Sequence, residues 1–151
     1  MPAVTEYTKA EFIKVLEATE KMKAIEELAS VFNDSNVSGD VDSLVRALKE
    51  REEIMSTGIG FGIAIPHAKI AAVKEMAFAI GISKKGIPFD SMDGEPVYLV
   101  ILVAAGERQH KEYLRLLSNI MSIIKKDRVK DAIIGSQSSE EVLAILKANT
   151  Q

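Results

Sequence analysis

Residues 51–69 read REEIMSTGIGFGIAIPHAK, and we expect the rest of the chain to be organised around this stretch. Glycines alternate with apolar residues over 58–62, a short apolar run follows, and Pro66 stands directly before His67. Glycine permits left-handed backbone conformations and lets a ligand approach the main chain closely. Proline lacks the N–H that a sheet ladder needs. The stretch therefore predicts a glycine-rich turn, a short strand and a histidine held rigidly at the strand's end.

The composition indicates one globular domain of 151 residues, in which 47% are hydrophobic and 27% charged. The net charge is −3 and no basic block occurs, which argues against nucleic acid as a partner. The longest apolar run, 97–105, is too short to cross a bilayer, so we expect no direct membrane insertion. The absence of cysteine excludes disulfides and thiolate chemistry and fits a cytoplasmic location.

The hydrophobic pattern predicts helices and strands in alternation around that stretch. Residues 1–8 are expected to form a loose lead-in, and 12–16 suit either a strand or, from the capping-box spacing of Thr8 and Glu11, a helix. The predicted helices are 20–32 (capped by Thr19), 41–53 (capped by Asp40), 109–126, a short one from Asp127 to Ile134, and a last one beginning at Ser138 or Ser139. The predicted strands after the glycine stretch are 76–82 and 97–105, separated by a loop over 84–96.

These elements place the chain in the α/β class, with a mixed sheet of about four to five strands flanked by helices in three α/β/α layers. The run 97–105 is rich in β-branched residues and has no alternation of polarity, which is typical of a central strand covered on both faces. No internal repeat or linker divides the chain, so 1–151 is expected to be a single domain.

Taken singly, the polar residues of the stretch have ordinary explanations. His67 could make a backbone hydrogen bond at a strand end, and Arg51 could stabilise the C-terminus of the second predicted helix. His110 suits a solvated helix start, and the hydroxyls of Ser56 and Thr57 suit a turn. No spacing of the two histidines supports a metal site.

Taken together, the residues resemble a known family. Arg51–Glu52, Ser56–Gly60 and Gly62–His67 resemble the active-site signature of the fructose/mannitol-type (type 2) enzyme IIA domain of the bacterial phosphoenolpyruvate-dependent sugar phosphotransferase system. The segment 86–104 and the His110 helix are similar too, so the resemblance covers nearly the whole chain. It implies the fold of the mannitol and fructose IIA domains, in which 12–16 is a strand.

The resemblance also implies a phosphotransferase with a phosphohistidine intermediate. In this family the histidine after the proline, here His67, accepts a phosphoryl group from the phosphocarrier protein HPr and passes it to an enzyme IIB protein or domain. Arg51 and His110 match the residues that stabilise the phosphoryl group. No cofactor, nucleotide or metal is required, and docking onto a membrane permease complex is left open. Two departures from the family pattern, Ala68 after the histidine and the segment 106–114 around His110, bear on which donor and acceptor are used.

Several groups of the stretch suit this chemistry. A neutral imidazole is nucleophilic near pH 7, and the planar cation of Arg51 matches phosphate oxygens. Backbone N–H groups of the glycine turn could face an anion, and the Ser56 and Thr57 hydroxyls could donate to phosphate. Ile59, Phe61 and Ile63 could form an apolar docking surface.

The resemblance leaves a second function open. The protein could be a regulatory, nitrogen-type IIA protein whose phosphorylation state controls its binding to other proteins. A non-catalytic binding module with the same fold is a third hypothesis, against which the joint presence of Arg51, His67 and His110 argues.

Overall fold

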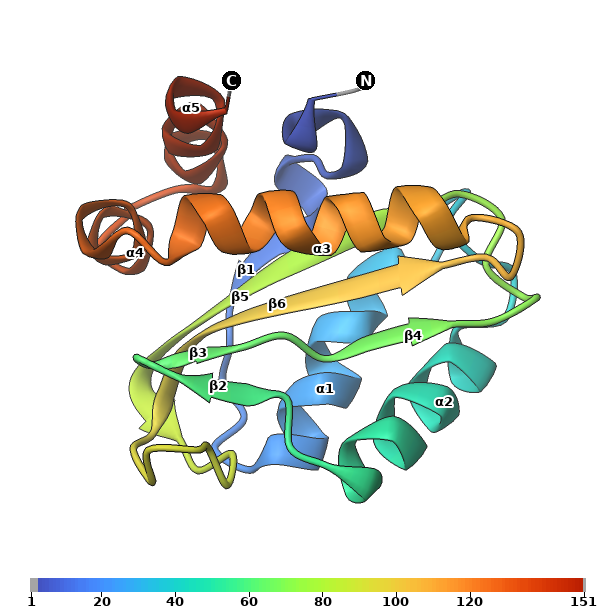
Figure 1. The fold of residues 1–151 in the computed structure, drawn as a ribbon, viewed down its shortest axis with the longest axis horizontal. Helices are drawn as coiled ribbons and strands as arrows, with labels where there is room; N and C mark the ends of the chain where they lie inside the picture. Colours follow the sequence, from blue (N-terminus) through green and yellow to red (C-terminus); the bar gives the residue numbers. More distant parts are fainter. Residues whose placement is uncertain (1–2, 151) are drawn as a thin grey trace.

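The computed structural model describes residues 3–150, which form a mixed sheet between two layers of helices (Figure 1). The strands are β1 Ile13–Val15, β2 Gly58–Gly60, β3 Ile63–Ala64, β4 His67–Lys69, β5 Ala77–Ile87 and β6 Val97–Ala105. The helices are α1 Lys21–Ala29, α2 Val41–Ile54, α3 His110–Ile124, α4 Asp127–Ile134 and α5 Ser139–Asn149, with short 3-10 helices η1 Val4–Tyr7, η2 Ala10–Phe12 and η3 Ser30–Phe32. The predicted α/β class and three layers are confirmed.

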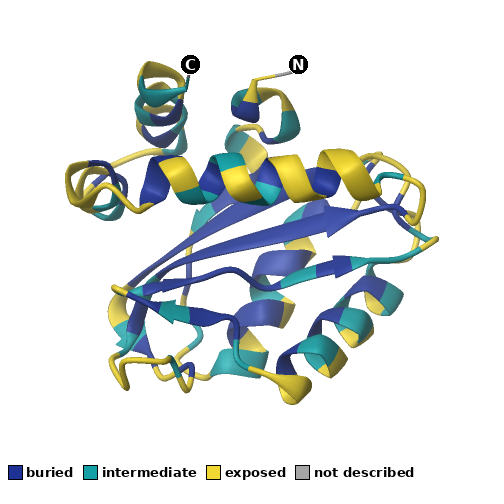
Figure 2. Ribbon diagram, viewed as in Figure 1, coloured by how far each residue is buried: buried dark blue, intermediate teal, exposed yellow. Residues whose placement is uncertain are grey.

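The sheet is built around β6. Its order is β1-β5-β6-β3-β2, and β4 pairs with β6 beyond the end of β3. β6 runs antiparallel to β5 and parallel to β3 and β4, so it has partners on both sides along its length. Figure 2 shows β6 and much of β5 as buried. The prediction that 97–105 is a central strand covered on both faces is confirmed.

Two apolar cores lie on the two faces of the sheet. α1 and α2 cover one face, where Leu28, Leu44 and Leu102 are buried. α3, α4 and α5 cover the other face, where Ile101 and Leu116 are buried. The alternation of side chains along each strand sends successive residues to opposite cores. This alternation decides which residues of β4 face α3.

The sheet has six strands within residues 3–150, one more than the upper expectation of five. The difference comes from the glycine stretch, which forms three short strands in place of a turn and one strand. β2 and β3 make a hairpin whose turn is Phe61–Gly62. β3 then ends at Ala64, and Pro66 interrupts the ladder before β4 begins. His67 therefore starts a strand, which corrects the expectation that it ends one.

Other boundaries also differ from prediction. The loop expected over 84–96 begins later, because β5 continues to Ile87. The helix expected over 20–32 begins after Glu20 without a side-chain cap, so Thr19 does not cap it, and it finishes as the 3-10 turn η3. The fourth helix has Lys126 at its N-cap, where Asp127 was expected. By contrast, Asp40 accepts a hydrogen bond from Ser43 N and caps α2 as predicted.

The N-terminal segment is ordered from residue 3 onward. Val4 in η1 is buried, and η1 packs against α3 and α5. This corrects the expectation of a loose lead-in over 1–8, because an apolar side chain anchors the segment to the core; residues 1 and 2 lie outside the described part of the chain. β1 confirms the strand expected within 12–16, preceded by the short turn of η2. No helix in the described residues has the length and apolar character needed to span a membrane.

Candidate active site around His67

His67 is held at the edge of the sheet by β6. It lies opposite Val103 in the parallel ladder, and Val103 N donates to the carbonyl of Pro66 at 2.9 Å. Ala68 faces the core under α1 and α2, so His67 and Lys69 face the side that α3 covers. The rings of His67 and Tyr113 on α3 are 6.0 Å apart, centroid to centroid. The histidine is only partly buried there.

One hydrogen bond fixes the tautomer of the His67 ring. Nδ1 lies 2.7 Å from the carbonyl oxygen of Ile65. A carbonyl oxygen can only accept, so Nδ1 carries the hydrogen and donates it. In the neutral ring Nε2 then holds the lone pair. The geometry thus leaves Nε2 as the nucleophilic atom.

His110 belongs to the same face of the molecule through Lys69. Lys69 Nζ lies 2.9 Å from His110 Nδ1, and Lys69 points to the same side of β4 as His67. An ammonium group only donates, so His110 Nδ1 accepts and its Nε2 carries the hydrogen. His110 is exposed at the first turn of α3. The structure therefore connects the two histidines, which are far apart in the sequence, through β4.

Arg51 lies in the last turn of α2, which packs against β4. Its Nη1 donates to the carbonyl of Met55 at 2.9 Å, so the helix-end role considered for Arg51 is also present. Burial raises the pKa of the Tyr113 hydroxyl to about 12, and the positive charge of Arg51 opposes that rise. The guanidinium thus acts electrostatically on the residue whose ring is near His67. Tyr113 is not among the site residues expected from the sequence.

Ser56 and Thr57 are engaged within the protein. Thr57 is buried, and its hydroxyl donates to Glu52 Oε1 at 2.6 Å. The Ser56 hydroxyl donates to the carbonyl of Phe89. Each hydroxyl has one hydrogen, which these bonds use. A phosphate-binding role for the two residues stays a prediction, and their hydrogen bonds do not favour it.

The glycine-rich turn lies at the other end of β6 from His67. The carbonyl of Gly62 accepts from Tyr98 N, whereas His67 pairs with Val103. At about 3.3 Å per residue, that offset along β6 is about 16 Å. Phe61 N donates to Asp93 Oδ2, so a turn amide is already satisfied by the protein. The expectation that this turn faces the anion is not supported by its position.

Exposed apolar side chains at the end of α2 and on α3 are not those expected to dock a partner. Ile54 and Met55, at the end of α2, are 81% and 68% exposed, and Leu114, next to Tyr113, is 52% exposed. Of the residues expected to dock a partner, Ile63 is buried and Phe61 sits at the distant hairpin tip. Only Ile59 remains half-buried against the α3 side of the core.

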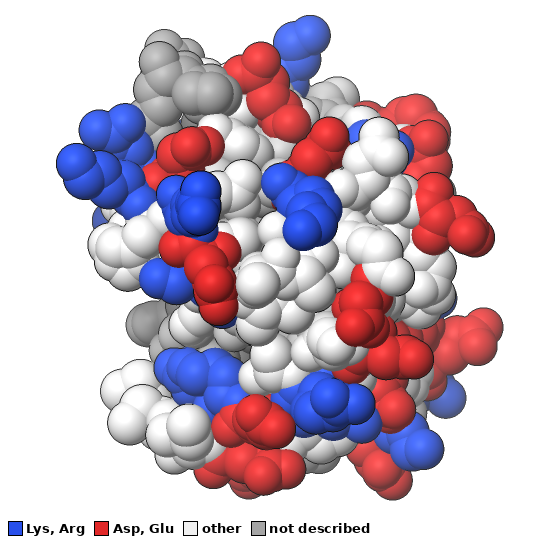
Figure 3. Space-filling view, turned by 90° about the vertical axis from the view of Figure 1, so that its right-hand side faces the viewer, with Lys and Arg blue, Asp and Glu red and all other residues white. Residues whose placement is uncertain are grey.

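The charges on one face of the described residues are mixed. The face toward which β4 and β6 point carries charges of both signs among uncharged side chains (Figure 3). Within residues 3–150 no three His, Asp or Glu side chains are grouped to hold a metal ion.

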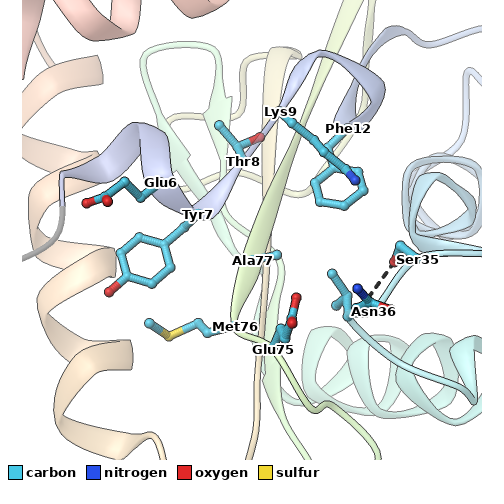
Figure 4. Close-up of a pocket in the computed structure, with 11 residues that line it drawn as sticks. Glu6, Tyr7, Thr8, Lys9, Phe12, Ser35, Asn36, Glu75, Met76 and Ala77 are labelled. Atoms are coloured by element: carbon cyan, nitrogen blue, oxygen red, sulfur yellow. Dashed lines mark hydrogen bonds between the residues drawn. The ribbon is translucent and has the colours of Figure 1, made fainter.

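A separate hollow of about 150 Å³ lies between the N-terminal segment and the start of β5 (Figure 4). Its lining includes Glu6, Tyr7, Lys9, Glu75 and Met76, which bring charges of both signs and apolar groups together. None of the histidines or arginines discussed above lines it. The hollow therefore does not belong to the site around His67.

Comparison with known proteins identifies the family to which this chain belongs. Residues 6–149 match the family model described as phosphoenolpyruvate-dependent sugar phosphotransferase system, EIIA 2. The chain is 34% identical over 144 residues to a fructose-specific EIIABC component of Bacillus subtilis, covering 95% of this chain and 23% of that protein. It is 34% identical over 126 residues to a fructose-specific EIIA component of Haloferax volcanii, covering 83% of this chain and 82% of that protein.

Solved structures agree with the sequence comparisons. The nitrogen regulatory protein IIA-Ntr of Neisseria meningitidis superimposes with a TM-score of 0.88 at 29% identity, over 95% of this chain and 98% of that one. The mannitol IIA protein of Escherichia coli has the same fold, with a TM-score of 0.79 at 23% identity, over 92% of this chain and 98% of that one. This chain belongs to the EIIA type 2 family of the phosphoenolpyruvate-dependent sugar phosphotransferase system.

Proposed function

We propose that His67 accepts a phosphoryl group from phosphorylated HPr and passes it to an enzyme IIB partner for sugar uptake. In the first step the Nε2 lone pair forms a bond to phosphorus while the bond between phosphorus and the donor atom of HPr breaks. The second step reverses this at His67, where the P–Nε2 bond breaks as the acceptor's bond forms. The hydrogen bond from Nδ1 to Ile65 carries the proposal, because it keeps the lone pair on Nε2.

His110 and Arg51 supply the charge stabilisation that phosphoryl transfer needs. His110 holds its hydrogen on Nε2, because Nδ1 accepts from Lys69, and that N–H can donate to a phosphoryl oxygen. Arg51 contributes a permanent positive charge and a planar fork of donors. Residues of α2, β4 and α3 thus act on one group. No metal or nucleotide takes part in either step.

Protein partners are expected to dock over the exposed apolar side chains beside the site. Ile54, Met55 and Leu114 leave apolar surface next to polar groups, as docking surfaces do. The structure of the Escherichia coli mannitol IIA protein in complex with phosphorylated enzyme IIB has the same fold as this chain. A cytoplasmic location follows from the proposed donor and fits the lack of cysteine.

The test is the intact mass of the protein after incubation with phosphoenolpyruvate, enzyme I and HPr, followed by peptide mapping that preserves acid-labile phosphate. We expect one added phosphoryl group on the peptide holding His67, and none on His67→Ala. His110→Ala is the matched histidine control, which retains the label on His67 but forms it more slowly. Unchanged labelling of His67→Ala would refute the assignment.

A regulatory function is the second candidate, and a specific observation favours it. IIA-Ntr gives a TM-score of 0.88, and a nitrogen regulatory protein of Bradyrhizobium diazoefficiens is 26% identical over 97% of this chain. In that case the same phosphohistidine would control binding to other proteins. Pull-downs with phosphorylated and unphosphorylated protein test this. If both forms capture the same partners, the result counts against a regulatory function.

A further inference from the structure

Glu52 is a buried carboxylate directly after Arg51, and the charge-stabilising scheme above makes no use of it. Its side chain is fully buried, whereas Arg51 is half-buried at the site. We propose that Glu52 is a positioning residue that fixes the tautomer and orientation of the His67 ring through Thr57 and Ile65. The proposal rests on the phosphotransfer function proposed for His67 and adds the residue that prepares the nucleophile.

The first link joins the end of α2 to Thr57, the residue before β2. Glu52 Oε2 accepts from Thr57 N at 2.7 Å, and Oε1 accepts from the Thr57 hydroxyl at 2.6 Å. Both carboxylate oxygens thus hold the same residue, which fixes the peptide of Thr57 in orientation as well as in position. Lys21 Nζ lies 3.3 Å from Oε2 and supplies the compensating charge.

The second link runs from Thr57 to the corner between β3 and β4. The carbonyl of Thr57 accepts from Ile65 N at 3.0 Å. β3 ends at Ala64 and Pro66 has no N–H, so this bond holds the corner where the ladder is interrupted.

The third link reaches the imidazole. The carbonyl of Ile65 accepts from His67 Nδ1 at 2.7 Å. Thr57 binds the N–H of Ile65 and Pro66 restricts the backbone rotation of Ile65, so the Ile65 carbonyl is held for the histidine. Glu52, Thr57, Ile65 and His67 therefore form a continuous series of short contacts from a buried charge to the reactive ring.

The burial of Glu52 requires a specific reason. A carboxylate without water is costly unless donors satisfy it, and a buried ion pair often adds no stability over apolar side chains of similar size. Here the donors are two groups of Thr57 and one lysine. We attribute the retained charge to its control of Thr57, because a strong acceptor is what holds both donors of that residue.

The experiment compares Glu52→Gln with the matched control Glu27→Gln. Glu27 also accepts backbone N–H groups, those of Glu17 and Ala18, and pairs with Lys14, but it braces the end of β1. Ring 15N shifts of His67 in the unphosphorylated protein report the tautomer, and single-turnover transfer from phosphorylated HPr gives the rate at saturation and the KM.

For Glu52→Gln we expect loss of the pure Nδ1–H signature of His67 and a rate at saturation lower by about tenfold to a hundredfold, with KM little changed. Glu27→Gln should retain the wild-type tautomer and rate. If Glu52→Gln keeps both the Nδ1–H signature of His67 and the wild-type rate, the proposal is overturned.

A second pair of variants covers the case in which Glu52→Gln does not fold. Thr57→Val removes the hydroxyl at constant shape and should move the tautomer and the rate in the same direction, and Thr57→Ser should restore them. If Thr57→Val folds with wild-type 15N shifts and rate, the proposal that both carboxylate oxygens of Glu52 must hold Thr57 is overturned. If the wild-type protein is never phosphorylated on His67, the proposed function fails, and the 15N shifts still decide whether Glu52 sets the tautomer.

Discussion

At the scale of single residues, the imidazoles of His67 and His110 each have Nδ1 in a hydrogen bond. Their Nε2 atoms nevertheless differ, since one holds a lone pair and the other a hydrogen. His67 donates from Nδ1 to a carbonyl, so its Nε2 is a nucleophile. His110 accepts at Nδ1 from an ammonium group, so its Nε2 is a donor. The neighbour of each ring thus decides its role.

Lys69→Met tests the neighbour of His110. The change removes the donor to Nδ1 while keeping the length and apolar stem of the side chain. We expect the transfer rate from phosphorylated HPr to fall by about tenfold, less than the loss of a direct donor costs. Lys74→Met, which alters an exposed lysine of the loop between β4 and β5, is the control and should leave the rate unchanged. Equal rates for the two variants would remove Lys69 from the site.

Tyr113 predicts a pH dependence of stability in the alkaline range. Burial raises its pKa to about 12, against 10.0 for an ordinary tyrosine. The folded state therefore holds the phenol proton more tightly than the unfolded chain does. Its contribution to the free energy of unfolding is complete below about pH 10 and decreases as the pH rises toward about 12.

Urea unfolding of the wild type and of Tyr113→Phe over this range measures the effect. The wild type should lose stability more steeply than the variant above about pH 10, since lysines titrate in both proteins alike. Parallel curves would show that Tyr113 titrates in the folded protein as in the unfolded one.

Sequence reasoning at this scale singled out His67, Arg51 and His110 as candidates through their resemblance to a family signature. It did not single out Lys69, Tyr113 or Glu52, which the structure places in contact with these candidates or with the segment that holds them. Tyr113 has the spacing of an ordinary buried stripe, and Lys69 is a single lysine after an apolar run. Their roles come from contacts between β4, α2 and α3, which local patterns do not encode.

At the scale of elements, the bounds of the long helices and strands are set by their own sequence. The short strands form only where neighbouring strands complete their hydrogen-bond ladders. The bounds of β6 match the apolar run 97–105, and Asp40 marks the start of α2 by its capping chemistry. β2, β3 and β4 have two or three residues each and exist because β6 and one another complete their ladders. The turn and the short strand before Pro66 were therefore predicted from the glycines and the proline, whereas β2 before the turn and β4 after the proline were not.

The turn between β2 and β3 predicts a difference between two substitutions of Phe61. This residue has a left-handed backbone, with φ of 59°, and a side chain that is 75% exposed. Left-handed geometry is costly for any residue with a Cβ, whereas glycine adopts it readily. We expect Phe61→Gly to be more stable than Phe61→Ala by about 1 kcal/mol in urea unfolding.

Because both variants lose the aromatic ring, their comparison isolates the backbone. Equal stabilities would mean that the turn relaxes when the ring is removed. The backbone of Phe61 is held on both sides, because its N–H donates to Asp93 and its carbonyl accepts from Lys130. We therefore expect the turn to stay in place.

At the scale of the whole molecule, β6 divides the protein into two cores of comparable importance. Ile101 faces the core under α3, and Leu102 faces the core under α1 and α2. Both are fully buried. Truncating either to alanine should cost about 2 to 5 kcal/mol of the free energy of unfolding.

Urea unfolding of Ile101→Ala, Leu102→Ala and the control Val15→Ala checks this. Val15 lies in β1 at the sheet edge and is 51% exposed, so its truncation should cost much less. A small cost for one β6 variant and a large cost for the other would mean that a single core carries the fold.

The place of β6 at the centre of the sheet also has a consequence for protein synthesis. The ribosome makes His67 before residues 97–105, so the ladder described for β4 has no partner strand until β6 has also emerged from the ribosome. Until then the segment around His67 has no partner strand to hold the ring for the proposed phosphoryl donor. Phosphorylation of His67 would therefore report that a newly made molecule has completed its sheet, and a phosphate label could be used to count finished molecules among growing ones.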